Sequence, residues 1–161
     1  MEVFFMSKTL VAYFSASGVT KAMAEKLAKT LGADLFEITA DPPYSEADVN
    51  WKNPLARCNK EWFGKKKVPC GGGVDNMGEY DRVLIGFPIW YGCAPVVVNS
   101  FTEKYDFTGK KVGLFASSIS SKIGKTLEKL QPHVKGAVIA DAVRFPQDAS
   151  GEEMAQWAEK L

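Results

Sequence analysis

The chain has 161 residues, 46% of them hydrophobic, and a formal net charge of +1. That length suits one domain with a layered core, so we expect a single domain over residues 1–161. A charge this close to zero gives no field to attract nucleic acid or anionic lipid, and neither is an expected partner. The apolar run at residues 3–6 is too short for a signal or membrane-spanning segment. We therefore interpret residues 1–7 as a short N-terminal extension and expect a cytoplasmic protein.

The three cysteines and the one histidine exclude several kinds of site. Cys58, Cys70 and Cys93 match no zinc or haem spacing, and an odd number cannot pair completely, so reduced thiols are expected. His133 follows a proline in an expected loop. A single histidine cannot form a histidine metal cluster, and no metal site is predicted.

Residues 8–38 are predicted to form one βαβ unit. Residues 8–14 are almost wholly apolar and predict a buried strand. Apolar side chains then recur at helical spacing from Val19 to Leu31, and Gly32 is expected to end that helix. Residues 34–38 predict a second strand, and the crossover between the two strands should be right-handed.

Residues 39–78 are less regular. Their large apolar residues recur at helical spacing and predict an amphipathic helix that packs two tryptophans inward; they are Trp51, Leu55, Cys58 and Trp62. Residues 65–73 hold three lysines and three glycines and are interpreted as a solvated, flexible connection. We expect the segment 41–78 to lie over the sheet edge, where it could cover a ligand.

Three more strands are expected at residues 80–88, 111–116 and 137–145, with helices after each. Pro95 suits the first position of one of these helices, and Ser150 with Glu153 forms a capping box for the last. Strands that alternate with helices predict an α/β fold, a three-layer doubly wound domain with a five-stranded parallel sheet.

The strand ends carry the residues that suggest a ligand, because ligands of open parallel sheets lie beyond the carboxyl ends of the strands. The first strand runs through hydroxyl residues and Gly18 directly into a helix, whose first amides and dipole favour an anion such as phosphate. The third strand leads to Trp90 and Tyr91. Successive side chains of an extended segment alternate, so at least one of these rings should be available to a flat ligand. The fourth strand leads to a serine-rich loop.

These stretches resemble the flavodoxin family. The matching residues are 11–20 (VAYFSASGVT), 86–95 (GFPIWYGCAP) and 115–126, and the similarity extends over most of the chain from Lys8 onward. The resemblance implies a flavodoxin-like sheet of order 2-1-3-4-5 that binds FMN, with the phosphate in the first loop and the ring system at the second and third. The implied cofactor-binding residues are Ser15, Ala16, Ser17, Gly18, Val19, Thr20, Pro88, Ile89, Trp90, Tyr91, Gly92, Ser117, Ser118, Ile119 and Ser120.

The third loop departs from the family pattern. Relatives usually have two glycines there, whereas this chain has Ile119 and other larger residues in their place. A β-branched Ile119 and the nearby Lys122 could narrow the approach of backbone amides to the flavin, so flavin affinity or potential is the property affected.

Several functions are compatible with this sequence. The resemblance favours an FMN-binding electron-transfer flavodoxin with a redox partner protein. Electron shuttles of the family are usually markedly acidic, whereas this chain has a formal net charge of +1. An NAD(P)H-dependent quinone or nitro-compound reductase is therefore the alternative. A flavin-free binding domain is less favoured. A P-loop nucleotide-binding protein is suggested by residues 124–126 (GKT), but the glycine that this motif requires four residues earlier is absent.

Overall fold

The computed structural model describes residues 8–117 and 122–161. Five parallel strands form the central sheet in the order β2-β1-β5-β6-β7. They are β1 (Thr9–Tyr13), β2 (Asp34–Glu37), β5 (Arg82–Pro88), β6 (Lys111–Ser117) and β7 (Ile139–Phe145). Counted along the main sheet only, this is the predicted order 2-1-3-4-5, and the doubly wound α/β fold is confirmed.

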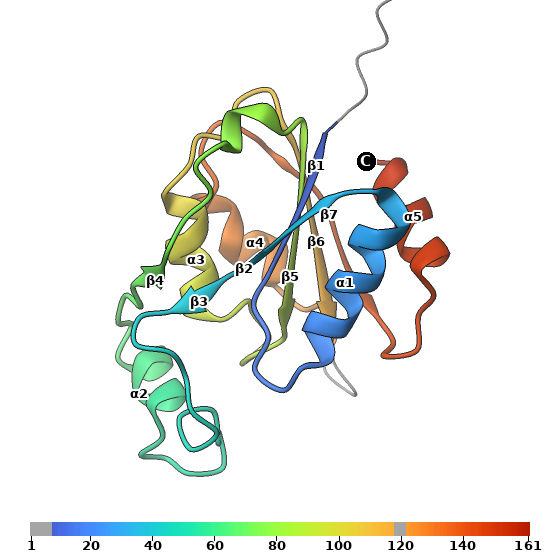
Figure 1. Cartoon of the computed structure of the whole chain (residues 1–161). Helices are drawn as coiled ribbons and strands as arrows, with labels where there is room; N and C mark the ends of the chain where they lie inside the picture. The colour runs from blue at the N-terminus through green and yellow to red at the C-terminus, as the bar shows by residue number, and fades with distance from the viewer. Residues whose placement is uncertain (1–7, 118–121) are drawn as a thin grey trace, which may run out of the picture.

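Helices cover both faces of the sheet (Figure 1). On one face lie α1 (Val19–Leu31) and α5 (Gly151–Glu159), and on the other lie α3 (Val96–Glu103) and α4 (Thr126–Leu130). Because both faces are covered, the strand residues alternate between two cores. Val83 and Ile85 pack on the side of α3, whereas Leu84 packs on the side of α1.

Helix boundaries follow the chemistry that the sequence predicts. Gly32 caps α1 in the left-handed conformation, and its amide donates to helix carbonyls. Ser150 caps α5, where its side chain accepts a hydrogen bond from the Glu153 amide at 3.0 Å. Pro95 lies one position earlier than expected, at the N-cap of α3. The helix expected around Ile123 begins only at Thr126 and is followed by a 3₁₀ turn (Gln131–His133) that contains Pro132.

The segment between β2 and β5 differs most from the sequence interpretation. A small antiparallel pair, β3 (Thr39–Ala40) with β4 (Cys70–Gly71), joins its two ends. The prediction of a flexible connection over 65–73 was therefore wrong at residues 70–71, and Val68 is also buried. A 3₁₀ turn (Met77–Glu79) leads on to β5. The paired ends hold the enclosed residues as a loop that projects beyond the sheet (Figure 1).

The helix within this loop, α2 (Arg57–Phe63), is shorter than predicted. Trp51 is 67% exposed, so the prediction that both tryptophans pack inward was wrong. Asparagine side chains here accept hydrogen bonds from backbone amides that would otherwise donate to helix carbonyls. The Lys52 amide donates to Asn50 Oδ1, and the Leu55 amide donates to Asn53 Oδ1. These turns replace the first part of the predicted helix.

Candidate functional site

The loop between β1 and α1 presents free backbone donors. The Phe14 amide ties the end of β1 to the Gly86 carbonyl at 2.9 Å. Gly18 has a φ of +92°, which a residue without a Cβ adopts readily, and its amide donates to the Ser15 hydroxyl at 3.0 Å. No side chain caps the N-terminus of α1, and its first turn contains no acidic residue. With Ala16 and Ser17 exposed, the first helical amides are open to an anion.

Thr20 makes a different contact from its neighbours in this loop. It is 2% exposed, and its Oγ1 lies 2.6 Å from Oγ of Ser117, the last residue of β6. Thr20 and Ser117, which were expected to contact different parts of FMN, are therefore hydrogen-bonded to each other. This bond connects the first predicted loop to the beginning of the third.

The second loop is a tight turn after β5, which ends at Pro88. The Trp90 and Cys93 backbones exchange two hydrogen bonds of 2.9 and 3.0 Å. Between them Tyr91 and Gly92 have φ angles of +55° and +73°. Positive φ at both central residues is typical of a type I′ turn. The turn fixes the directions in which the two aromatic side chains leave the backbone.

The two rings of this loop point to different neighbours. Trp90 packs edge-on against Phe14 and Tyr44, with ring centroids 5.5 and 5.7 Å away. Tyr91 stacks on Trp62 of α2 at 5.1 Å with an interplanar angle of 12°. Both rings are half-buried. Ile89 is also half-buried and packs against the core on the α3 side of the sheet.

The third loop is described only at its two ends. Ser117 ends β6, whereas Ser118, Ile119 and Ser120 lie outside the described residues. Where the chain resumes, the Lys125 amide donates to the Gly92 carbonyl at 3.3 Å. Gly124 has a φ of +57°, and a Cβ at this position would lie 3.0 Å from the same carbonyl. The second and third loops are thus in direct backbone contact.

The alternative of a P-loop finds no support in this region. Its hydroxyl residue would be Thr126, which is fully buried, and its oxygen makes no hydrogen bond. A P-loop needs that hydroxyl exposed at a metal ion. Within residues 8–117 and 122–161, no group of three or more His, Cys, Asp or Glu side chains that could hold a metal ion is found.

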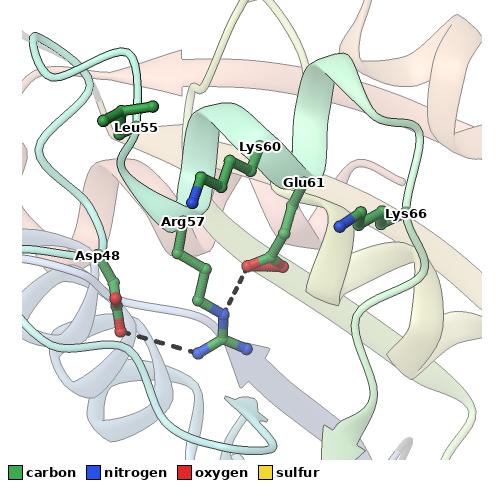
Figure 2. Close-up of a pocket in the computed structure, with 6 residues that line it drawn as sticks. All are labelled: Asp48, Leu55, Arg57, Lys60, Glu61 and Lys66. Atoms are coloured by element: carbon green, nitrogen blue, oxygen red, sulfur yellow. Dashed lines mark ion pairs between the residues drawn. The ribbon is translucent and has the colours of Figure 1, made fainter.

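The loop that contains α2 adds residues that the sequence interpretation missed. Figure 2 shows Arg57 between two carboxylates: its Nε lies 2.6 Å from Glu61 Oε1, and its Nη1 lies 3.9 Å from Asp48 Oδ2. The guanidinium also lies over the Tyr44 ring at 4.2 Å. The Tyr44 hydroxyl donates to Glu61 Oε2 at 3.1 Å. From the sequence, only the pairing of Arg57 with Glu61 could have been predicted, because the two residues are four positions apart on a helix.

These contacts hold Tyr44 beside the first two loops. Its ring meets Phe14 edge-on at 5.6 Å as well as Trp90. Burial, and after it the charge of Glu61, raises the pKa of the Tyr44 phenol, so this side chain stays a neutral donor. A cavity of about 200 Å³ here is lined by Phe14, Ser15, Ala16, Tyr44 and residues of β2 and β3, among others. Tyr44 thus places part of the segment 41–78 beside the first two predicted loops, and a cover over a ligand stays a prediction.

The cysteines are free thiols, as predicted. Burial raises the pKa of the Cys70 and Cys93 thiols and keeps them protonated near neutral pH. Cys58 lies 3.7 Å from the Tyr91 hydroxyl, which also bonds to Asn59. These contacts attach the second loop to α2.

Comparison with known proteins decides the family. A sequence model described as flavodoxin matches residues 8–161. The chain belongs to the flavodoxin family. A curated flavodoxin from Haemophilus influenzae is 28% identical over 139 residues, which are 79% of this chain and 63% of that protein's length. The chain thus spans less than two thirds of this curated relative.

Solved structures resemble this flavodoxin-family chain over nearly its whole length. A protein from Bacteroides eggerthii assigned as a flavoprotein is 34% identical, with a TM-score of 0.89 and coverage of 97% of this chain and 98% of that one. One from Bacteroides uniformis is 36% identical, with a TM-score of 0.86 and coverage of 95% and 98%. A flavoprotein from Lactobacillus acidophilus, solved in complex with FMN, shares the fold at 23% identity, with a TM-score of 0.67 and coverage of 94% and 99%.

The described residues contain no helix that is long and apolar enough to cross a membrane.

Proposed function

We propose that this chain binds FMN at the ends of β1, β5 and β6 and uses it in electron transfer. The observation that carries the proposal is the uncapped, carboxylate-free first turn of α1 beside Ser15 and Ser17. A phosphate monoester carries a charge of roughly −1.5 to −2 and suits such a turn. Lys21 is the cation of that turn, so backbone and hydroxyl donors together with the helix dipole would hold most of the charge.

The aromatic turn is the second support. A flat ring system could be contacted by Trp90 or Tyr91, and such stacking contributes about 0.5–1.5 kcal/mol beyond burial. The Lactobacillus acidophilus flavoprotein, which has the same fold, was solved with FMN. When bound, FMN supplies the redox chemistry. The residues of this chain would position it, and the aromatic contacts from Phe14, Tyr44 and Trp90 would keep the loops in place.

The distribution of charge bears on the electron donor. Residues 50–67 carry six cations and a single carboxylate: Lys52, Arg57, Lys60, Lys65, Lys66 and Lys67, with Glu61. Because this segment packs on Tyr91, the surface beside the second loop is basic although the whole chain is nearly neutral. Such a surface would attract an acidic redox partner protein or the anionic NAD(P)H. A reductase that oxidises NAD(P)H directly is therefore retained as the second candidate.

Two measurements on the purified chain test the proposal. Titration with FMN, followed by quenching of flavin fluorescence, should show saturable binding at one site per chain. The loaded protein is then mixed with NADPH in the absence of oxygen. An electron carrier should lose its flavin colour only when a separate reductase is added, whereas bleaching by NADPH alone would favour the second candidate. Absence of FMN binding would contradict both and favour a flavin-free binding domain.

A further inference from the structure

A second cavity lies outside the three predicted flavin loops. Its volume is about 500 Å³, and it is formed by the end of α2, one side of α3, and the segment from α4 to the following 3₁₀ turn. Figure 1 shows α2 beyond the end of α3, on the side of the sheet that α3 and α4 cover. We name this cavity the lysine pocket, after four lysines that line it: Lys65, Lys66, Lys67 and Lys129.

The backbone after α2 brings three consecutive lysines to one cavity. Lys65 has a φ of +50°, in the left-handed region. The Lys65 amide donates to the Trp62 carbonyl and the Lys66 amide donates to the Glu61 carbonyl, which is the hydrogen-bond pattern of a Schellman motif. Consecutive side chains of an extended chain would point to opposite sides. Because of this turn, Lys65, Lys66 and Lys67 all line the lysine pocket.

The lining of the lysine pocket has four lysines and one carboxylate, Glu103. Among the described residues, no carboxylate forms an ion pair with any of the four lysines. The carboxylate in the lining, Glu103, lies 2.5 Å from Nδ1 of His133. An anion that entered the lysine pocket would therefore meet cations whose charges are unpaired.

The remaining wall is aromatic and apolar. It is formed by Trp62, Phe63 and Val96. Phe63 is 75% exposed, and covering an exposed ring of this size with an apolar group is favourable. Trp62 is held in place by its stacking on Tyr91. Asn99 and Ser100 of α3 add polar groups to the same lining.

We propose that the lysine pocket binds a small aromatic compound that carries a carboxylate or sulfonate group. The aromatic wall would contact the flat, apolar body, and the lysines would pair with the acid group. Its volume falls within the usual range for small-molecule sites, about 300–1,000 Å³. The lysine pocket shares no lining residue with the predicted flavin loops, although Lys65, Lys66 and Lys67 also belong to the basic surface beside the second loop. This proposal goes beyond FMN binding and does not require it.

Calorimetric titration of the purified full chain tests the proposal, with 2-naphthoate as the probe and uncharged 2-naphthylmethanol as its matched control. We expect 2-naphthoate to bind at one site, about tenfold or more tighter than the alcohol, and to weaken as salt is raised. Equal affinity for the two compounds would overturn the proposal. Displacement of 2-naphthoate by FMN, one for one, would also overturn it, because the ligand would then occupy the flavin site.

Matched variants locate the binding. Replacement of Lys65, Lys66 and Lys67 by Gln should weaken 2-naphthoate binding about tenfold or more, whereas replacement of the exposed Lys29, Lys135 and Lys160 by Gln removes the same charge elsewhere and should leave affinity within about twofold. An equal loss in both triple variants would overturn the proposal.

The aromatic wall is tested separately. Phe63→Ala should weaken binding about fivefold, and Leu55→Ala, at an equally exposed residue outside the lysine pocket, should not. No effect of Phe63→Ala would contradict the aromatic part of the proposal. Both side chains are mostly exposed, so neither variant should impair folding.

Discussion

The hydroxyls of Thr20 and Ser117 lie 2.6 Å apart, buried, although 97 positions separate the two residues in the sequence. Thr20 is in the first turn of α1, and Ser117 ends β6. The bond therefore joins the predicted phosphate loop to the start of the third loop across β5. A buried hydroxyl that loses its partner costs about 1–3 kcal/mol, so this bond should contribute to the geometry of the whole site.

Removal of both partners should cost less than the sum of the two single removals. We expect Thr20→Val, which keeps the shape of the side chain, to lower the free energy of unfolding by about 1–3 kcal/mol, and Ser117→Ala to do the same. The double variant should be clearly more stable than the sum of the two losses implies, because no hydroxyl is left without a partner. Urea denaturation measures all four proteins. Additive losses would show that the two hydroxyls do not depend on each other.

Gly124 is expected to tolerate no side chain. Ala at this position would adopt a positive φ, at a cost of about 1–2 kcal/mol, and its Cβ would also press on the Gly92 carbonyl. Gly32→Ala is the matched control, since Gly32 has a similar φ of +64° and open space around it. Thermal or urea unfolding should show a greater loss for Gly124→Ala by about 1 kcal/mol or more. Equal losses would mean that the contact between the second and third loops is unimportant.

The pair of Arg57 and Glu61 should hold the α2 loop against the site. Glu61→Gln keeps the size of the side chain but removes the charge that faces Arg57, and we expect a loss of about 2 kcal/mol in the local stability of this loop. Hydrogen exchange of the amides in Arg57–Phe63 measures this stability. Glu46→Gln, an exposed change of the same charge in the same loop, should leave the exchange rates unchanged. Similar exchange in both variants would contradict this function of the pair.

Alkaline pH should destabilise the protein through its tyrosines. All five have a raised pKa, with burial as the first cause in each: Tyr13, Tyr44, Tyr80, Tyr91 and Tyr105. For Tyr13, burial followed by the charge of Glu37 raises the pKa from 10.0 to about 12. Since folding favours the protonated phenol, this stability is complete below pH 10 and is lost as the pH rises toward about 12. Tyrosines that ionise near pH 10 in the folded protein, seen by phenolate absorbance, would contradict the burial described.

The first turn of α1 can be tested with a single imino acid. Proline is tolerated at the first position of a helix, where its missing N–H would otherwise have no partner. Val19→Pro therefore removes one amide from the proposed phosphate site and should preserve the helix. We expect FMN to bind about tenfold more weakly and riboflavin to be unaffected. A parallel loss for both ligands would indicate a general distortion of the loop, and circular dichroism checks the helix.

The parallel sheet and the ends of α1 could be predicted because each depends on local signals: long apolar strands, and Gly32 after Leu31. That at least one of the Trp90 and Tyr91 rings is available to a flat ligand stays a prediction, since Trp90 packs on Phe14 and Tyr91 stacks on Trp62. The α2 loop could not be predicted, since its structure depends on turns formed by Asn50 and Asn53 and on the pairing of β3 with β4. The bond from Thr20 to Ser117 joins distant parts of the chain, and no sequence spacing indicates it.

The central claim is that the loop between β1 and α1 holds the phosphate of FMN. Riboflavin has the same ring system and lacks only that phosphate, so the ratio of the two dissociation constants tests the claim directly. We predict that the wild-type chain binds FMN at least about a hundredfold more tightly than riboflavin, and that the difference falls in Val19→Pro. Near-equal affinities of the wild-type chain for FMN and riboflavin would contradict the claim.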